Sequence, residues 1–206
     1  PHFIFGEVIE IFSCKRCGMG RTYPAPSITL DFYEDNDKYD FLFVGKEKLY
    51  KSFASSLLEM LSSNDRAQGK NLLDVGCGGG FLVQAANQMG YQASGIEANA
   101  DMVRWAGERG IPVEQGDIKQ MLSKPDRYDV IVLSAILEHL SDPSSILSDC
   151  KKLLTSGGVV LVSQASYDGL LPRFFPWGWY GWQPQEHYWH FTPTSFSKLA
   201  ETCGFR

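Results

Sequence analysis

The chain has 206 residues, of which 44% are hydrophobic and 21% charged, and its formal net charge is −5. This length and composition suit one α/β domain with a buried core and a short appendage, and they exclude global disorder. Because the chain is acidic, we expect neither nucleic acid nor a membrane surface as its partner. No apolar run reaches the roughly 18 to 20 residues that span a bilayer, and the first residues lack a signal peptide's apolar core, which predicts a cytoplasmic protein.

The first 30 residues contain a CxxC motif, and we interpret them as a separate partial zinc-ribbon-like segment. Residues 2–12 are rich in β-branched and aromatic residues, which predicts a strand, and they lead into Cys14-Lys15-Arg16-Cys17-Gly18. The cysteine count is odd and the other three cysteines lie in ordinary helix or loop patterns, so no disulfide framework is expected. Because one knuckle supplies two ligands, we expect Cys14 and Cys17 to bind zinc only if other ligands complete the site.

The remaining residues, 31–206, have the pattern of one α/β domain. Residues 46–63 predict an amphipathic helix, because apolar side chains recur every three or four residues, at Leu49, Phe53, Leu57, Met60 and Leu61. From residue 71 onward, short apolar runs alternate with helical stretches, which indicates βαβ units and a parallel sheet. We expect strands near 71–75, 92–97, 112–115, 128–134 and 157–163, with helices near 80–89, 100–109 and 143–154.

We place the core of the domain at residues 69–164. Its last strand and the segment that follows it have two further notable features. The pair Gly157-Gly158 is expected to end the last of these helices and to begin the last strand. Residues 165–191 hold four of the five tryptophans together with several glycines and prolines, and we interpret them as an aromatic lid or wall over a substrate pocket, with plain core as the alternative. A final helix is expected over 194–203. Because the sequence begins at Pro1 and stops at Arg206, we expect structure to be missing at both ends.

The strongest motif runs from Asp74 to Gly80, where an apolar strand enters a glycine turn that opens a helix. Glycine is required where a backbone bends tightly or where a ligand approaches the main chain. A dinucleotide fingerprint would need glycine at position 81, which is Phe81, so a nicotinamide cofactor is disfavoured. The pattern DxGxGxG instead resembles the cofactor-binding turn of class I S-adenosylmethionine-dependent methyltransferases. The resemblance implies that the turn, Cys77 included, holds the cofactor's methionine end and that Asp74 meets its ammonium group.

Acidic residues also follow the second and third predicted strands. Glu97 stands at the carboxyl end of the second strand, where a carboxylate can accept the ribose hydroxyls of an adenosine ligand. Asp117 follows the third strand, and it resembles the family position that accepts a hydrogen bond from the adenine amino group while the next residue, Ile118, packs on the ring. Their regular order after successive strands supports an adenosine cofactor.

The segment from Tyr128 to Pro143 extends the resemblance, since its DVI…LEHL.DP pattern is similar to that of small-molecule methyltransferases of the type 11, 12 and 23 families and the ubiquinone-biosynthesis O-methyltransferases. The resemblance covers 71–163 and, less specifically, the stretch from Glu186 to Thr192. It implies a Rossmann-like, doubly wound, mostly parallel sheet of seven strands. We place only five, so the C-terminal strands are expected to be missing. It also places Ser134 beneath the sulfonium.

Three histidines are candidate bases for a hydroxyl acceptor, because an imidazole titrates near neutral pH. They are His139, His187 and His190, and the alternative is that they only shape their loops. The sequence therefore predicts an enzyme that transfers the methyl group of S-adenosylmethionine to a small molecule, most readily at oxygen, and releases S-adenosylhomocysteine. The alternative is a non-catalytic module of the same fold that binds the cofactor or a partner.

Overall fold

The computed structural model describes residues 2–4, 7–26, 47–62, 71–175 and 179–206. The chain forms two compact units. The sheet unit comprises residues 31–134 and 149–163, and the second unit comprises 1–30, 135–148 and 164–206. The segment 1–30 thus shares its unit with later parts of the chain. The predicted division into domains 1–30 and 31–206, with a core at 69–164 and a lid at 165–191, stays a prediction.

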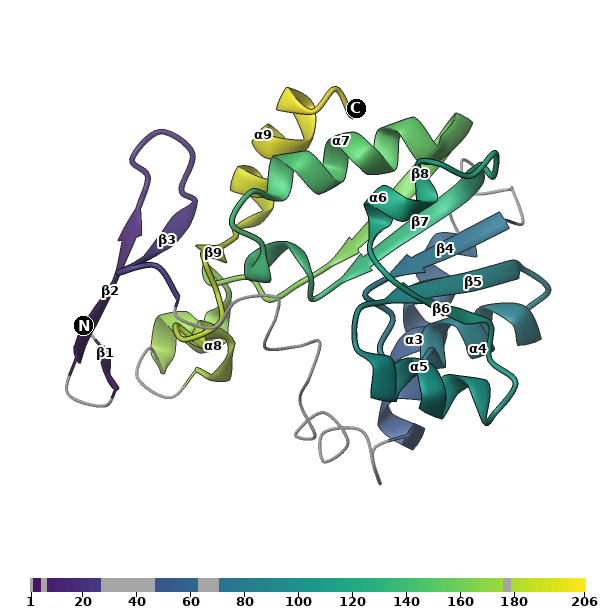
Figure 1. Cartoon of the computed structure of the whole chain (residues 1–206). Helices are drawn as coiled ribbons and strands as arrows, with labels where there is room; N and C mark the ends of the chain where they lie inside the picture. Colours follow the sequence, from purple (N-terminus) through teal and green to yellow (C-terminus); the bar gives the residue numbers. More distant parts are fainter. Residues whose placement is uncertain (1, 5–6, 27–46, 63–70, 176–178) are drawn as a thin grey trace. The chain divides into compact units, whose positions relative to one another are not determined.

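The sheet unit is built on five parallel strands (Figure 1). They lie in the order β6-β5-β4-β7-β8. Because the chain moves from β4 outward to β6 and then returns to β7, the strand order reverses between β4 and β7, which creates a topological switch point. This arrangement confirms the predicted Rossmann-like fold. The strands are β4 (Asn71–Val75), β5 (Gln92–Glu97), β6 (Val113–Gln115), β7 (Tyr128–Ser134) and β8 (Leu154–Ser163).

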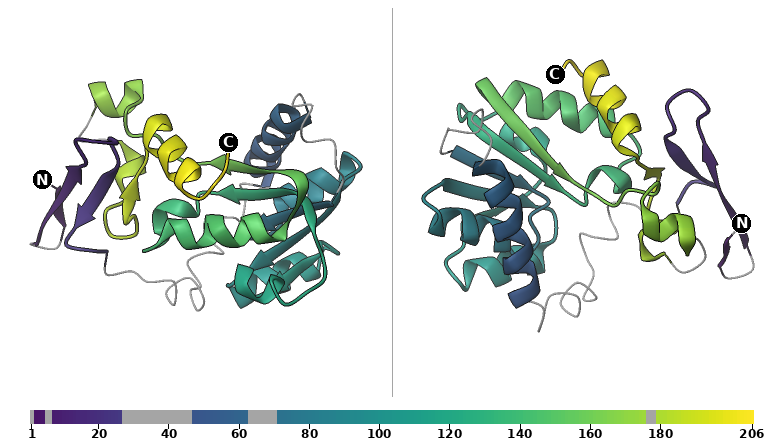
Figure 2. Two further views of the ribbon diagram at one scale, coloured as in Figure 1. Left: turned by 90° about the horizontal axis from the view of Figure 1, so that it is seen from above. Right: turned by 180° about the vertical axis from the view of Figure 1, so that it is seen from behind.

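Helices cover the sheet of this unit, and α3 (Glu47–Ser62), α4 (Phe81–Gln88) and α5 (Ala100–Gly107) lie on one face (Figure 2). The short α6 (Ile118–Met121) follows β6. Right-handed crossovers place α6 on the opposite face, because the chain changes direction across the sheet after β6. The core is made of aliphatic side chains from β4, β5, β7 and the three helices, and Leu58, Leu72, Val83, Ala86, Ala106, Val130 and Val132 are at most 2% exposed.

The buried face of α3 differs from the predicted one. Leu57 and Leu61 are buried as expected, but Phe53 is 46% exposed and Met60 is 65% exposed. The core-facing stripe instead continues through Ala54 and Leu58, because positions i, i+3, i+4 and i+7 share one face of a helix. The side chain of Leu49 lies outside the described residues.

The start of β8 also corrects the sequence prediction. The helix before it ends at Leu153 and β8 begins at once at Leu154, so Gly157 and Gly158 lie inside the strand. The pairing of β7 with β8 is irregular there, and Gly157 has a φ of +84°. A side chain at Gly158 would come within 3.1 Å of the Tyr128 and Asp129 carbonyl oxygens. The two glycines therefore permit a bulge against β7 and do not end the helix.

The second unit contains an antiparallel sheet in the order β1-β2-β3-β9. The expected single strand at 2–12 is in fact two strands, β1 and β2. The aromatic segment is more regular than predicted, because it contains α8, η2 and β9. Its residues Pro176–Gly178 lie outside the described residues. The elements are β1 (His2–Ile4), β2 (Glu7–Ser13), β3 (Gly20–Tyr23), η1 (Leu137–His139), α8 (Leu170–Phe174), η2 (Tyr180–Trp182), β9 (Trp189–His190) and α9 (Pro193–Thr202), while α7 (Pro143–Leu153) begins in this unit.

The helices of both units are short or polar. Over the residues that the structure describes, none combines the length and the apolar character that crossing a membrane requires.

Candidate functional site

The glycine turn after β4 has a backbone that side chains would disfavour. Gly76, Gly78 and Gly80 have φ values of +65°, +54° and +74°, in the left-handed region that L-residues with a Cβ rarely occupy. At Gly80, which caps α4, a Cβ would also come 2.7 Å from the Ile111 side chain. The predicted glycines are therefore required by the turn itself, whose backbone opens at the switch point of the sheet.

Glu97, at the end of β5, holds this turn in place. Its carboxylate accepts hydrogen bonds from the backbone N–H of Gly78 at 2.8 Å and from that of Asn99 at 2.9 Å. Each oxygen uses one of these bonds, and an ionised carboxylate has about four acceptor positions. The side chain can thus fix the protein backbone and still accept hydrogen bonds from the hydroxyls of a ligand.

Asp74, in β4, is the most strongly perturbed acid of the site. It is 4% exposed, and burial, together with the nearby charge of Glu97, raises the pKa of its carboxyl to about 8. Among the described residues, no cationic side chain forms an ion pair with it. A cationic group brought by a ligand would stabilise the ionised form of Asp74. The ammonium group of an amino-acid ligand would be such a group, and the role predicted for Asp74 stays a prediction.

Cys77 lies in the turn, but its side chain points back into the protein. A Cβ at Gly95 would overlap the Cys77 sulfur, so the thiol occupies the space that this glycine leaves open. Burial raises the pKa of the Cys77 thiol, which keeps the group neutral. Only the backbone of Cys77 remains as a candidate contact with the cofactor.

The other predicted cofactor residues follow β6 and β7. The Asp117 carboxylate caps α6 by accepting hydrogen bonds from the backbone N–H groups of Lys119 and Gln120 through Oδ1. Ile118 is 6% exposed and belongs to the core. Ser134 ends β7, opposite Ser163 of β8. Parallel strands bring Asp74, Glu97, Asp117 and Ser134 to one edge of the sheet, whereas their contacts with a cofactor stay predictions.

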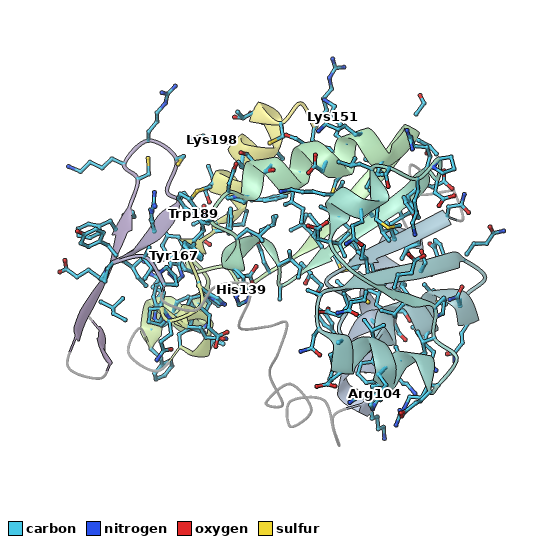
Figure 3. The ribbon with its side chains drawn as sticks, in the orientation of Figure 1. Arg104, His139, Lys151, Tyr167, Trp189 and Lys198 are labelled. Carbon is cyan, nitrogen blue, oxygen red and sulfur yellow. The ribbon has the colours of Figure 1, made fainter. Side chains whose placement is uncertain are left out.

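A second polar cluster lies in the other unit, where η1 supplies Glu138 and His139 and the 183–188 loop supplies His187 (His139 is labelled in Figure 3). The rings of His139 and His187 meet edge to face, with centroids 4.6 Å apart. Burial lowers the pKa of each of these two histidines to about 4, and burial raises the pKa of Glu138 to about 7. Both imidazoles are therefore neutral at pH 7.

His190 has different surroundings from the other two candidate bases. Its Nε2 lies 2.9 Å from the Thr22 hydroxyl, within hydrogen-bond distance, and its ring lies 5.3 Å from that of Trp182. The side chain is 3% exposed. These contacts join β9 to β3 and η2, and the catalytic roles predicted for the three histidines stay predictions.

Two polar residues were not singled out by the sequence analysis. Glu138 stood out only as the neighbour of His139, and its burial was not visible in the sequence. Asn99 is 1% exposed and caps α5, because its side chain accepts a hydrogen bond from the backbone N–H of Met102 at 2.9 Å. An Asn shortly before a helical pattern was the available signal.

The CxxC segment forms a tight turn between β2 and β3. The backbone N–H of Gly18 donates to the Cys14 carbonyl and the N–H of Cys14 donates to the Met19 carbonyl, both at 2.8 Å. Both cysteines are free thiols. Zinc binding by Cys14 and Cys17 stays a prediction that depends on ligands from elsewhere.

Comparison with known proteins identifies the family. A family model described as a methyltransferase domain (Methyltransf_23) matches residues 46–206. A ubiquinone biosynthesis O-methyltransferase of Proteus mirabilis is 39% identical over 102 residues, which cover 46% of this chain and 42% of the relative. The chain thus spans less than half the length of this curated relative.

Solved structures agree on the fold. A SAM-dependent methyltransferase from Archaeoglobus fulgidus is similar with a TM-score of 0.60 at 24% identity, covering 82% of this chain and 73% of its own. The plantazolicin methyltransferase BpumL, solved in complex with SAH, has a TM-score of 0.62 at 17% identity, covering 81% and 67%. With the family match over most of the chain and the parallel sheet in place, the chain belongs to the Methyltransf_23 family of methyltransferase domains and has the class I methyltransferase fold.

Proposed function

We propose that this chain transfers the methyl group of S-adenosylmethionine to an oxygen atom of a small-molecule acceptor. The observation that carries the proposal is the combination of two features: the buried Asp74, which forms no ion pair with a described residue, and the glycine turn that Glu97 holds at the switch point of the sheet. The name of the Proteus mirabilis relative supports oxygen as the methylated atom.

In this proposal, different residues of the sheet unit would bind different parts of the cofactor. Asp74 would meet the ammonium group of the methionine end, and the turn from Gly76 to Gly80 would let that end approach the backbone. Glu97 would accept the ribose hydroxyls through its remaining lone pairs. The free oxygen of the Asp117 carboxylate would accept from the adenine amino group, with Ile118 beside the ring and Ser134 beneath the sulfonium.

When bound, the cofactor supplies a methyl group on a sulfonium, which is a good leaving group for in-line displacement. The protein then has to orient the acceptor, and orientation alone can supply several kcal/mol, up to about 7 to 11 in favourable cases. A hydroxyl acceptor must also lose a proton. Burial lowers the pKa of His139 and of His187 to about 4, so each ring is neutral at pH 7 but a weak base, and a base role requires the bound acceptor to raise that pKa.

The first experiment is calorimetric titration of the purified chain with S-adenosylmethionine and S-adenosylhomocysteine, with NADH as the control. We expect micromolar binding of the first two, lost in Asp74→Ala and Glu97→Ala, and no binding of NADH. No binding of either adenosyl ligand to a folded chain would overturn the cofactor assignment. Cofactor binding without methyl transfer to any hydroxyl acceptor would favour the alternative of a non-catalytic module.

A second experiment separates a base from a structural histidine. Once an acceptor is known, His139, His187 and His190 are each replaced by Gln, and turnover is measured at saturating cofactor. Loss of a general base should lower kcat by about 100-fold or more. A histidine that only shapes its loop should change kcat much less.

A further inference from the structure

The polar cluster of the second unit has the composition of a metal site. Glu138, His139 and His187 each offer one ligand atom, and these atoms all lie within 4.8 Å of one another. Glu138 and His187 are each only 5% exposed. One carboxylate oxygen of Glu138, Oε2, is buried without a hydrogen-bond partner. A buried acceptor without a partner is unfavourable, and a bound cation would satisfy it.

The two histidines are already oriented as metal ligands commonly are. A ligating histidine usually donates the N–H of its second ring nitrogen to a carbonyl or carboxylate, which fixes the tautomer and aims the other nitrogen at the ion. The Nδ1 atom of His187 lies 3.1 Å from the Gly181 carbonyl oxygen. The ring of His139 forms a hydrogen bond with the Glu186 backbone, which raises its pKa against the stronger effect of burial. With these N–H groups donated, each ring keeps one nitrogen lone pair.

The main chain holds the two ligand-bearing segments in register, although His187 follows His139 by 48 positions in the sequence. The backbone N–H of Tyr188 donates to the Glu138 carbonyl at 2.8 Å. The Trp189 indole N–H also donates to the Ser141 carbonyl at 3.4 Å. Both bonds lie within one unit, so the cluster is a built arrangement, and its member His139 is partly exposed to solvent.

The ligand set favours a transition metal over magnesium or calcium. Imidazole nitrogen suits zinc, iron, copper and nickel, whereas magnesium and calcium prefer all-oxygen sites. Two histidines with one glutamate leave the fourth position of a tetrahedral zinc open. Bonds of about 2.0 to 2.1 Å require ligand atoms about 3.3 Å apart, so the cluster has to contract by up to about 1.5 Å. Small side-chain rotations about Glu138 and the imidazoles can supply this movement.

We propose that Glu138, His139 and His187 bind one divalent transition-metal ion, with zinc as the ion to test, and that the ion keeps an open position for an oxygen ligand. The proposed site shares no residue with the CxxC motif or with the predicted cofactor residues. Its existence does not depend on methyl transfer, so failure of one proposal leaves the other standing.

The test uses the full chain without an affinity tag and with Cys14→Ser and Cys17→Ser, because thiolates are zinc ligands and would compete for the added metal. The protein is stripped with a chelator and titrated with Zn²⁺ alone. We expect one ion per chain with micromolar or tighter affinity. Glu138→Gln, His139→Gln and His187→Gln, each in this background, should weaken binding by at least about 100-fold. The matched control is His2→Gln, which removes a histidine outside the cluster and should leave the affinity unchanged.

X-ray absorption at the zinc edge of the unsubstituted cluster avoids the risk that a variant fails to fold. The expected spectrum has only nitrogen and oxygen ligands at about 2.0 to 2.1 Å, with the outer-shell pattern of two imidazoles. Thermal unfolding in EDTA then checks that each metal-free variant has the same Tm as the serine variant from which it was made, before their zinc affinities are compared. The proposal is overturned if the serine variant binds no zinc, or if its bound zinc persists in all three cluster variants.

Discussion

The Glu97 carboxylate accepts a hydrogen bond from the backbone N–H of Gly78 at 2.8 Å, and so joins the end of β5 to the glycine turn after β4. The same carboxylate holds the N–H of Asn99 at the start of α5. One acid thereby orders two loops at the switch point of the sheet before any ligand binds. Preorganisation of this kind lowers the entropic cost of binding.

Replacing Glu97 by Gln tests this relationship. The amide keeps one acceptor oxygen but places an NH₂ group against one of the two backbone donors, and it removes the charge. Hydrogen bonds to charged groups contribute about 1.5 to 3 kcal/mol each, so we expect the affinity for S-adenosylhomocysteine to fall by about 10- to 100-fold. Calorimetry measures the change. Glu114→Gln, at an exposed acid in β6, is the matched control, and equal losses in both variants would contradict a specific role for Glu97.

Asp74→Asn should stabilise the ligand-free chain at high pH. The folded-state pKa of about 8 lies above the ordinary value of 3.8, so folding favours the protonated carboxyl. Wild-type stability is therefore unaffected below about pH 4 and decreases as pH rises towards 8, by at most about 6 kcal/mol. Asn avoids this loss. Urea unfolding at pH 5 and pH 8.5 should show that the advantage of Asp74→Asn grows with pH, while cofactor binding is lost.

The control for this prediction is Asp126→Asn, at an exposed site in the same unit. It should change the stability little at either pH. If the free energy of unfolding of the wild type and of Asp74→Asn changed equally with pH, burial would not raise the pKa of the Asp74 carboxyl in the ligand-free protein.

Ala135, directly after β7, has a φ of +53°, in the left-handed region. A residue with a Cβ is destabilised by roughly 1 to 2 kcal/mol in this conformation. Glycine avoids this strain, but the greater freedom of its unfolded chain offsets part of the gain in stability. We expect Ala135→Gly to raise the free energy of unfolding by about 0.5 to 1 kcal/mol. Ala200→Gly, inside α9, should lower it by about the same amount. Urea titration compares the two, and destabilisation by both changes would refute the strain argument.

Gly95 and Cys77 should be energetically coupled. A methyl group at position 95 would overlap the Cys77 sulfur and come 3.1 Å from Val83, and overpacking of this kind costs about 1 to 3 kcal/mol. The cost of Gly95→Ala should be smaller in a Cys77→Ala background, since the sulfur is then gone. A double-mutant cycle measured by denaturant unfolding gives the coupling directly, and strictly additive changes would contradict the contact.

The sequence determined the features that depend on local periodicity and backbone geometry. Alternating apolar runs predicted β4 to β8 and the helices α4, α5 and α7, but missed the short α6 and were wrong at the buried face of α3 and at Gly157-Gly158. The left-handed φ values of Gly76, Gly78 and Gly80 explain why the turn can be read from its glycines alone. These constraints act within a few residues, so they leave a pattern in the chain itself.

Only the tertiary structure decided which side chains meet. It turns the Cys77 thiol towards Gly95, ties both oxygens of Glu97 to backbone groups, and brings His187 against His139 across 48 positions of sequence. Burial then sets the protonation of Asp74 and Glu138. Distance and desolvation are properties of packing between segments remote in sequence, and no local pattern of residues encodes them.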